Sequence, residues 1–580
     1  MSSLNRRKFI AAGAGALAVA SVMRAAPAGA VPFGSPESTI PPPPNFPSGI
    51  PLYQQRYQNW SKEIILDAIW TCSPATPDDV VRLANWAHEN SYRIRPRGAM
   101  HGWTPLTIVN GENLDRVVLV DTMVHLNGIS VDTAGGATPG APATVTAGCG
   151  ATLEAILTQL QASGLGWVSV PAPGVLTIAG ALAVDAHGAA VPAAGEVPVP
   201  GTTYGSLSNL VTALTAVVWD GNAYALRSFD RSDPEITPLL THLGRAFLTS
   251  VTLMAGANPR MRCQSYTDID WRELFGAAGA QGRTFESFLQ QTGRVEAIWY
   301  PFTEKPWLKV WSICPERPLT AREVTGPYNY IFSDNLPEVV SDLIGQLTAG
   351  NTFIAPAFGQ VFYGTTVAGL AATASNDLWG WSKDVQFYIK PSTLLLTEGG
   401  GAVITSRDNV AQVIHDFTVW FEQRVSYYQS IGQFPINGPV EIRCCGMDAE
   451  SDLLVESAGP PTISAMRPRP DHPEWDTAIW LNVLGVPGTP GMFAFYREME
   501  QWMRSHYTGG WATFRPEWSK GWAFSTELPY KDADVIENIL PDTYREGVPV
   551  SENWDTARAT YNDLDPHRIY SNSFIDQLLP

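Results

Sequence analysis

The chain has 580 residues, of which 45% are hydrophobic and only 16% are charged, so its composition supports large buried cores and excludes a disordered chain. The formal net charge of −18 argues against general binding to nucleic acids or to anionic membranes, because these partners are themselves negatively charged. The length allows roughly three or four domains of average size, or two large ones.

The N-terminus carries the pattern of an export signal. Arg6 and Arg7 precede a short apolar run, and the run ends at the small residues Ala28-Gly29-Ala30. The arginine pair resembles a twin-arginine signal, whose cargo is generally folded and often holds a cofactor before export. Because the run is too short and too rich in glycine and alanine to span a membrane comfortably, we expect cleavage after Ala30 and a secreted mature chain.

Helices and strands alternate after a proline-rich segment at residues 31–54, which we expect to be extended and to lack a core of its own. Thr76 is suited to cap a helix, Pro77 suits its first turn, and the acidic residues that follow favour its positive end. Residues 92–96 then predict a short strand that leads to the glycine-flanked His101. Further strands are predicted at residues 116–122, 130–135 and 143–150, and a helix at residues 152–164.

The middle of the chain differs from what precedes it. Residues 201–256 continue a mixed pattern of helices and strands, whereas residues from about 261 to 515 alternate apolar strands with helices and hold most of the tryptophans. We expect the tryptophans near the end of this region to serve mainly in cores and grooves, where rigid walls would suit a bulky apolar substrate. These are Trp475, Trp480, Trp502, Trp511, Trp518 and Trp522. The pattern predicts an α+β fold.

Several catalytic motifs are absent from the sequence. It contains no GxSxG nucleophile elbow, no HExxH zinc motif, no GxxxxGK phosphate loop and, after the export signal, no complete GxGxxG. The six cysteines form no CxxC, so a cysteine-based zinc or redox site is not expected, and no metal is predicted. We expect the adjacent Cys444 and Cys445 to be two buried thiols.

Two segments rich in small residues are candidates for ligand binding. The first runs from Arg97 to Gly102 and includes a histidine, and the second covers residues 177–181 and continues to His187 and Gly188. Glycine and alanine let the backbone approach a ligand closely, and exposed backbone N–H groups bind phosphate. The two segments, about eighty residues apart, could therefore clamp one diphosphate.

Together with "YGSLSNLV" at residues 204–211, these segments resemble the vanillyl-alcohol-oxidase (VAO) family of flavoproteins. The resemblance implies a two-domain α+β protein with a VAO/PCMH-type FAD-binding domain and an α+β substrate-binding cap domain. In that family the histidine of the first segment, here His101, is often bonded to the 8α-methyl group of the flavin, and a neutral imidazole is a competent nucleophile for that bond. The implied FAD-binding residues are His101, Arg97, Gly98, Ala99, Met100, Gly102, Thr177, Ala179, Gly180, Ala181, His187, Gly188 and Asn209.

Glu441 and Arg443 point to catalytic chemistry. They alternate with apolar residues in a strand-like run, so both should lie on one face, close enough for a charge-assisted pair. An exposed surface pair would give the same pattern, but the apolar flanks favour burial. In sterol-oxidising members of the family, a Glu/Arg pair of this spacing lies over the flavin. By the same resemblance, the other active-site residues are Glu296, Glu398, Asn482 and Lys520.

The resemblance also implies an activity. The implied enzyme is a secreted oxidase that converts the 3-hydroxyl of a 3β-hydroxysterol to a ketone, moves the ring double bond into conjugation and reduces O2 to H2O2. Glu441 would take the hydroxyl proton, Arg443 would stabilise the oxygen, and Glu296 would carry a proton across one ring face. The expected cofactor is covalently attached FAD. The expected partners are the sterol and O2, with transient contact with lipid membranes, no nucleic acid and a monomeric state.

Two alternatives remain open. The same family includes oxidases of sugars, aldonolactones and aromatic alcohols, and the cap domain would decide between these substrates. A protein that carries sterols without redox chemistry would use the same apolar cavity but would lack a coloured cofactor.

The expected domain organisation combines the sequence pattern with the resemblance. The C-terminal residues resemble the closing element of the family, which returns to the flavin domain. The expected parts are an export signal at 1–30, a proline-rich segment at 31–54, the FAD-binding domain at 55–260, the cap domain at 261–515 and the return to the FAD-binding domain at 516–580.

Overall fold

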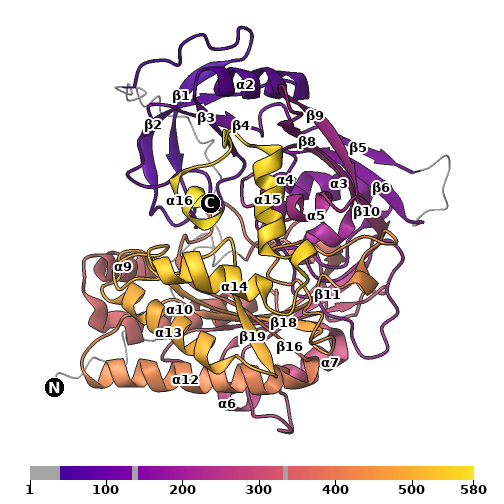
Figure 1. Cartoon of the computed structure of the whole chain (residues 1–580). Helices are drawn as coiled ribbons and strands as arrows, with labels where there is room; N and C mark the ends of the chain where they lie inside the picture. Colours follow the sequence, from indigo (N-terminus) through magenta and orange to yellow (C-terminus); the bar gives the residue numbers. More distant parts are fainter. Residues whose placement is uncertain (1–39, 134–140, 331–337) are drawn as a thin grey trace, which may run out of the picture.

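Two bodies of mixed helices and strands pack against each other in the computed structural model, which describes residues 40–133, 141–330 and 338–580 (Figure 1). The first body, indigo to magenta in Figure 1, contains two sheets, and the second contains one sheet of nine strands. The expected two-part α+β fold is confirmed. The predicted export signal lies outside the described residues, and within them no helix is long and apolar enough to cross a bilayer.

The first sheet leads the chain to the glycine-flanked His101. Helix α2 (Pro77–Glu89) begins where predicted, and Thr76 forms a reciprocal capping box with Asp79. Strand β3 (Arg93–Arg97) then pairs in parallel with β4 and ends at the turn. The other strands of this sheet are β1 (Leu52–Gln58), β2 (Ile65–Cys72) and β4 (Val117–Asp121), in the order β1-β2-β4-β3.

The second sheet of the first body is antiparallel, with the order β5-β6-β10-β8-β9, and β7 pairs with β10. Helix α3 (Leu153–Ala162) lies where a helix is predicted. The second small-residue segment holds the short helix α4 (Ile178–Ala183), because its alanines favour a helix. The strands are β5 (Ile129–Asp132), β6 (Ala143–Gly148), β7 (Leu165–Gly166), β8 (Val211–Trp219), β9 (Tyr224–Asp230) and β10 (Phe247–Ala257). The short helices η2 (Leu207–Leu210) and α5 (Ile236–Leu239) complete this body.

The second body is organised around one sheet, with the order β14-β15-β11-β13-β12-β17-β18-β16-β19. Its strands are β11 (Arg260–Tyr266), β12 (Arg294–Trp299), β13 (Trp307–Ile313), β14 (Arg322–Glu323), β15 (Asp377–Trp381), β16 (Thr397–Thr405), β17 (Val440–Gly446), β18 (Thr477–Gly485) and β19 (Ala512–Pro516). The helices are α6 (Trp271–Leu274), α7 (Phe285–Thr292), α9 (Glu338–Thr348), α10 (Ala355–Ala372), α11 (Ser382–Gln386), α12 (Val410–Ser430) and α13 (Met492–His506). All six cysteines are free thiols, and Cys444 and Cys445 are buried as expected.

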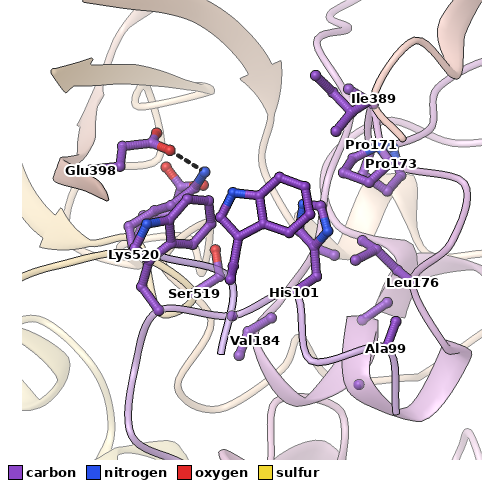
Figure 2. Close-up of a pocket in the computed structure, with 18 of the residues that line it drawn as sticks. Ala99, His101, Pro171, Pro173, Leu176, Val184, Ile389, Glu398, Ser519 and Lys520 are labelled. Carbon is purple, nitrogen blue, oxygen red and sulfur yellow. Dashed lines mark hydrogen bonds and ion pairs between the residues drawn. The ribbon is translucent and has the colours of Figure 1, made fainter. Parts of the chain in front are cut away.

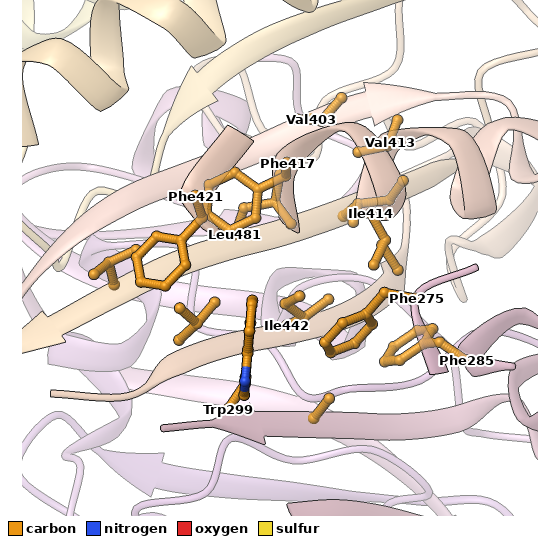
Figure 3. Close-up of a cluster of buried hydrophobic side chains, with 14 of the residues drawn as sticks. Phe275, Phe285, Trp299, Val403, Val413, Ile414, Phe417, Phe421, Ile442 and Leu481 are labelled. Carbon is orange, nitrogen blue, oxygen red and sulfur yellow. The ribbon is translucent and has the colours of Figure 1, made fainter. Parts of the chain in front are cut away.

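The long helix α12 covers one face of this sheet (Figure 3). The apolar layer beneath it includes Phe417 of the helix and Ile442 of β17. Each side chain of this kind contributes about 1.5–3 kcal/mol when it leaves water. Because strand side chains alternate, burial of Ile442 against the helix turns Glu441 and Arg443 to the opposite face of the sheet.

After β19 the chain returns to the first body (yellow in Figure 1). Helix α14 (Leu540–Arg545) still packs near β19, whereas α15 (Trp554–Leu564) lies against β8 and α5. A fully buried ion pair of 2.7 Å joins Arg245 of the first body to Asp565. The last helix is α16 (Ser573–Leu578), whose Asp576 pairs with Arg93 of β3. The domain boundaries named above stay a prediction.

Candidate active site

A cavity of about 400 Å3 lies between the two bodies and takes its wall from both. The first body contributes the turn after β3 and helix α4, and the second contributes β12, β16, β17 and the segment after β19. The predicted site residues in this wall are Arg97, Gly98, Ala99, Met100, His101, Gly102, Thr177, Ala179, Gly180, Ala181, His187, Gly188, Glu296, Glu398, Glu441, Arg443 and Lys520. Two predicted residues, Asn209 and Asn482, do not line the cavity.

The two small-residue segments form one cradle. A Cβ at Gly98 would overlap the Thr177 side chain, so only glycine lets the turn approach helix α4 this closely. Met100 adopts a left-handed φ of 55°, which shows how tightly the turn is held. At Gly102, by contrast, an added Cβ would have no atom within 4 Å. Close backbone packing with exposed N–H groups fits the diphosphate of a flavin nucleotide.

Arg97 and Asn209 hold backbone in place around the cradle. Arg97 forms a close ion pair with Asp121 of β4 and donates to Gln55 Oε1 at 3.1 Å, which fixes the end of β3. Asn209 donates through Nδ2 to the Tyr204 carbonyl at 2.7 Å, so it closes its own segment and does not face the cavity.

His101 lies in the cavity wall with Trp60 over its ring, at a centroid distance of 3.7 Å. Burial, with a smaller effect of the Lys520 charge, lowers the pKa of His101 to about 3, so the imidazole is neutral and keeps a free lone pair. In the view of Figure 2, His101 lies between Lys520 and the apolar residues of the far wall. The wall contains two further histidines: His187 is stacked on Trp480 at 4.0 Å, and burial lowers the pKa of both His187 and His242 to about 4.

Arg443 is the centre of a charged wall on the second body. Its guanidinium lies 3.0 Å from Glu441, 3.3 Å from Glu517 and 4.0 Å from Glu296. Strand register explains the arrangement, because Glu296 of β12 lies opposite Arg443 of β17. The predicted pairing of Glu441 with Arg443 is therefore part of a larger network.

A second ion pair extends this network. Lys520 forms a close ion pair with Glu398, drawn as a dashed line in Figure 2. Asn482 donates through Nδ2 to Glu398 and to Glu517, at 2.6 Å in both cases. Asn482 thus connects the two ion pairs from behind the wall, which explains why it does not line the cavity itself.

The charges divide the carboxyl groups into two kinds. Burial and the charges of Glu398 and Glu296 raise the pKa of Glu441 to about 7, although Arg443 opposes them. Burial alone would also raise the pKa of Glu296 and of Glu517, but in both groups neighbouring cations outweigh it and the pKa lies below the ordinary value. Glu441 can therefore bind and release a proton near neutral pH, whereas Glu296 and Glu517 hold their charge.

Sequence reasoning missed three residues of this site: Glu517, Tyr388 and Lys309. Glu517 stands three residues before Lys520 in "EWSKGW", so the same argument from a charge among aromatic residues could have found it. Tyr388 donates to Glu296 at 2.6 Å, and Lys309 lies 2.7 Å from the same carboxylate. No sequence motif identifies Tyr388 or Lys309, because both are distant from Glu296 in the sequence and contact it only in the folded chain.

Aromatic side chains complete the wall on the second body. The cavity is lined there by Tyr300, Trp307, Trp311, Phe362 and Tyr388, a rigid apolar surface suited to a bulky apolar substrate. The tryptophans named from the sequence, by contrast, pack in or against hydrophobic cores and do not line the cavity. The clustering of tryptophans in the sequence therefore did not predict which tryptophans of the chain face the cavity.

Comparisons with known proteins match both bodies. A family model for the FAD binding domain matches residues 70–227, and one described as cholesterol oxidase, substrate-binding, matches residues 260–580. A search of curated proteins found no match.

Solved structures match nearly the whole chain. The crystal structure of cholesterol oxidase from B. sterolicum is 67% identical with a TM-score of 0.91, and the match covers 94% of this chain and 100% of that one. A histidine-to-alanine variant of cholesterol oxidase from Brevibacterium sterolicum gives the same values. A solvent-stable cholesterol oxidase is 48% identical with a TM-score of 0.91, over 93% of this chain and 100% of the other.

The matches agree with the site. The FAD model covers the cradle and His101, and the substrate-binding model, which spans more than half of the chain, covers Glu296, Glu441 and Arg443. The residues of the cradle fit FAD, and the match to the second body favours a sterol over the sugar, aldonolactone and aromatic-alcohol alternatives. The chain therefore belongs to the cholesterol oxidase family, whose members oxidise cholesterol with FAD and O2.

Proposed function

We propose that this enzyme oxidises the sterol 3-hydroxyl with Glu441 as the proton acceptor and then moves the ring double bond into conjugation. One observation carries the proposal: a carboxyl group with a pKa of about 7 lines a largely apolar cavity 3.0 Å from a half-buried arginine. A general base works best when its pKa lies near the working pH.

The first step needs one proton acceptor and one stabilising charge. Bound FAD would supply the acceptor for the hydride from C3 and would return the two electrons to O2 as H2O2. Glu441 takes the proton of the hydroxyl group at the same time, so alcohol becomes ketone with the loss of one proton and one hydride. The neighbouring carboxylates raise the pKa of Arg443 above its usual value, so its positive charge is permanent and stabilises the negative charge that develops on oxygen.

The second step moves a proton between two ring carbons on one face. The sequence suggested Glu296 for this task, but its pKa is lowered, because Lys309 and Arg443 offset the effect of burial, and such a carboxylate is a poor proton acceptor. Glu441 is better suited, since it exchanges protons near neutral pH. We therefore assign proton transfer in both steps to Glu441, which releases the hydroxyl proton to solvent after the first step and then carries the ring proton from one carbon to the other, with Glu296 as the charge that faces Arg443.

Covalent attachment of FAD through His101 is the second part of the proposal. A neutral imidazole in the wall, stacked by Trp60 and flanked by the glycine cradle, has the free lone pair that the bond requires. His101→Ala tests it: after acid precipitation the wild-type pellet should stay yellow, and the variant should release its flavin. Flavin that stays with the precipitated variant would contradict attachment at this residue.

The proposed setting is extracellular. The twin-arginine pattern at the N-terminus supports secretion of a folded protein. We further propose that it is a monomer and contacts lipid membranes transiently to reach its substrate. Expression with Arg6 and Arg7 both changed to lysine should leave the protein inside the cell, and co-sedimentation with cholesterol-containing vesicles measures the membrane contact.

The decisive experiment mixes the enzyme with cholesterol in detergent without oxygen. Bleaching of the flavin band reports oxidation, and ultraviolet absorbance of a conjugated enone reports the isomerisation. Wild-type enzyme should give both signals, and Glu441→Gln should slow both. If bleaching occurs and no enone absorbance follows, the isomerisation proposal is wrong.

A further inference from the structure

Lys309 is a completely buried lysine that lies behind the charged wall. It belongs to β13, directly opposite Glu296 of β12, and its side chain is 0% exposed. Its Nζ lies 2.7 Å from Glu296 Oε2. Lysine is almost never fully buried unless it is paired, and this pair has a cavity-lining carboxylate as its other member.

Aromatic rings separate this ammonium group from the substrate. Nζ lies 3.1 Å from the Tyr388 ring centroid, 4.8 Å from that of Trp307 and 5.3 Å from that of Trp311. All three rings line the cavity, whereas Lys309 does not. The rings stabilise the cation and cover it, so Lys309 influences the reaction through Glu296 and not through contact with the sterol.

The register of three strands places alternating charges in one row. Lys309 of β13 lies opposite Glu296 of β12, and Glu296 lies opposite Arg443 of β17. Glu296 Oε2 accepts from the Tyr388 hydroxyl at 2.6 Å and faces Lys309, and Oε1 lies 4.0 Å from Arg443. The carboxylate is thus held between two cations.

A count of charges around the cavity shows what the lysine adds. The carboxyl groups of the network are Glu296, Glu398, Glu441 and Glu517, and the cations of the network that line the cavity are Arg443 and Lys520. The other arginines of the lining have partners outside the network: Arg97 pairs with Asp121, Arg294 pairs with Glu196, and Arg95 donates to backbone carbonyls. Lys309 is the third cation. With it, three carboxylates can stay charged opposite three cations, and one carboxyl remains to exchange a proton.

We propose that Lys309 is a positioning residue that holds Glu296 as a carboxylate beside Arg443 and so leaves Glu441 as the group that exchanges the substrate's proton. The inference rests on the proposed role of Glu441. The lowered pKa of Glu296 agrees with it: burial would raise that pKa, and Lys309 is the largest influence in the other direction.

The charged and titratable neighbours of the pair come from several elements of the second body. Facing Glu296 are Lys309, Arg443, Glu441 and Tyr388. Facing Lys309 are also Cys263 of β11 and Tyr330, and facing Glu441 are also Glu398, Lys520 and Tyr300, whose pKa burial raises. Burial raises the pKa of Cys263, Tyr330 and Tyr388, so these groups stay neutral near pH 7. Removal of Lys309 would therefore transfer a proton to Glu296, and Glu441 would lose a negative neighbour.

The test compares Lys309→Met, Lys309→Arg, Glu296→Gln and the double variant Lys309→Met/Glu296→Gln, all as FAD-loaded enzymes. The first readout is the visible flavin spectrum of the resting enzyme between pH 5 and 9, which reports charge near the flavin without turnover. The second is the acidic limb of the kcat/KM profile. Lys309→Met should move both midpoints down by about one pH unit, and Lys309→Arg should keep the wild-type midpoint.

The double variant separates positioning from packing. If Lys309 acts through Glu296, adding Glu296→Gln to Lys309→Met causes no further shift, because Glu296 is already neutral. An unshifted midpoint in Lys309→Met, or a full additional shift in the double variant, overturns the inference. If Lys309→Met does not fold, Glu296→Gln and the double variant should still share one midpoint, and different midpoints overturn the inference.

Failure of the proposed function gives a different result. Glu441→Gln should abolish the spectral titration, and a titration that persists in that variant removes Glu441 from its proposed role. Loss of the titration in Glu441→Gln together with an unchanged midpoint in Lys309→Met overturns only the role of Lys309.

Discussion

The two walls of the cavity are built in different ways. The cradle in the wall of the first body is built from backbone and small side chains, with Gly98 packed against Thr177, and this wall also carries three neutral histidines and the Trp60 ring. The wall from the second body combines aromatic rings with charged side chains on neighbouring strands, centred on Arg443. The first wall recognises its ligand by shape, and the second acts through charge.

This difference predicts which changes each wall tolerates. The cradle should be sensitive to added volume, because close backbone contact is what it offers a cofactor. The charged wall should be sensitive to a change of charge at constant volume, because its groups set one another's pKa values. Methyl additions therefore test the cradle, and isosteric substitutions that remove a charge test the charged wall.

Glu441→Gln should have the largest effect of all. The amide keeps the size of the side chain but cannot accept the hydroxyl proton, so kcat should fall by about 10²–10⁴-fold. Oxygen consumption with cholesterol measures it, with flavin content as the check that the cradle is intact. Glu235→Gln, which changes an exposed carboxylate paired with Arg227, is the matched control and should keep the wild-type kcat. A loss of less than tenfold in Glu441→Gln would rule out this residue as the main base.

The pH profile should show the same group in the unmodified enzyme. The active form of Glu441 is the carboxylate, and its pKa is raised to about 7, so activity is present above that pH and lost below it. Between pH 8 and pH 5, kcat/KM should fall by about 100-fold, since each pH unit below a pKa removes about tenfold of the base. Stability should change in the opposite direction, because the folded state binds this proton more tightly than the unfolded chain. A flat profile over this range would contradict the assignment.

Local patterns were enough to predict the parts of the site that are contiguous in sequence. The turn with His101 and the strand with Glu441 and Arg443 carry their signal in neighbouring residues, through glycine spacing and the two-residue period of a strand. The helix after Thr76 was predicted for the same reason, since a capping box is a local motif.

The contacts of the site that the sequence did not predict depend on the pairing of strands far apart in the chain. Lys309 meets Glu296 only because β12 and β13 pair in one register, and Tyr388 reaches the same carboxylate from a segment ninety-two residues away. Trp307 and Trp311, the tryptophans that the second body contributes to the cavity, were not distinguished from those of the cores, because burial in a core and exposure to a dry cavity favour the same residue type.

Gly98→Ala tests the shape of the first wall, with Gly102→Ala as its matched control. The new methyl group at Gly98 would overlap Thr177, and overpacking of this kind costs about 1–3 kcal/mol. We expect a lower melting temperature and a lower ratio of flavin to protein absorbance. The methyl group at Gly102 meets no atom within 4 Å, so its melting temperature should stay near that of the wild type. An equal fall in melting temperature in both variants would contradict the idea that close packing at Gly98 limits the volume of the cradle.

Thr76→Ala should have the smallest effect, because it removes a helix cap that contacts neither wall. The Thr76 hydroxyl accepts from the Asp79 backbone N–H at 3.2 Å, and loss of such a cap costs about 1 kcal/mol. Thr76→Ser keeps the cap and should keep the melting temperature. Because α2 precedes β3, which carries the turn with His101, the variant also asks whether the cradle depends on that helix. We expect flavin content and kcat to stay at the wild-type level, since β3 is held by its pairing with β4. A loss of flavin would mean that flavin binding by the cradle depends on the stability of α2.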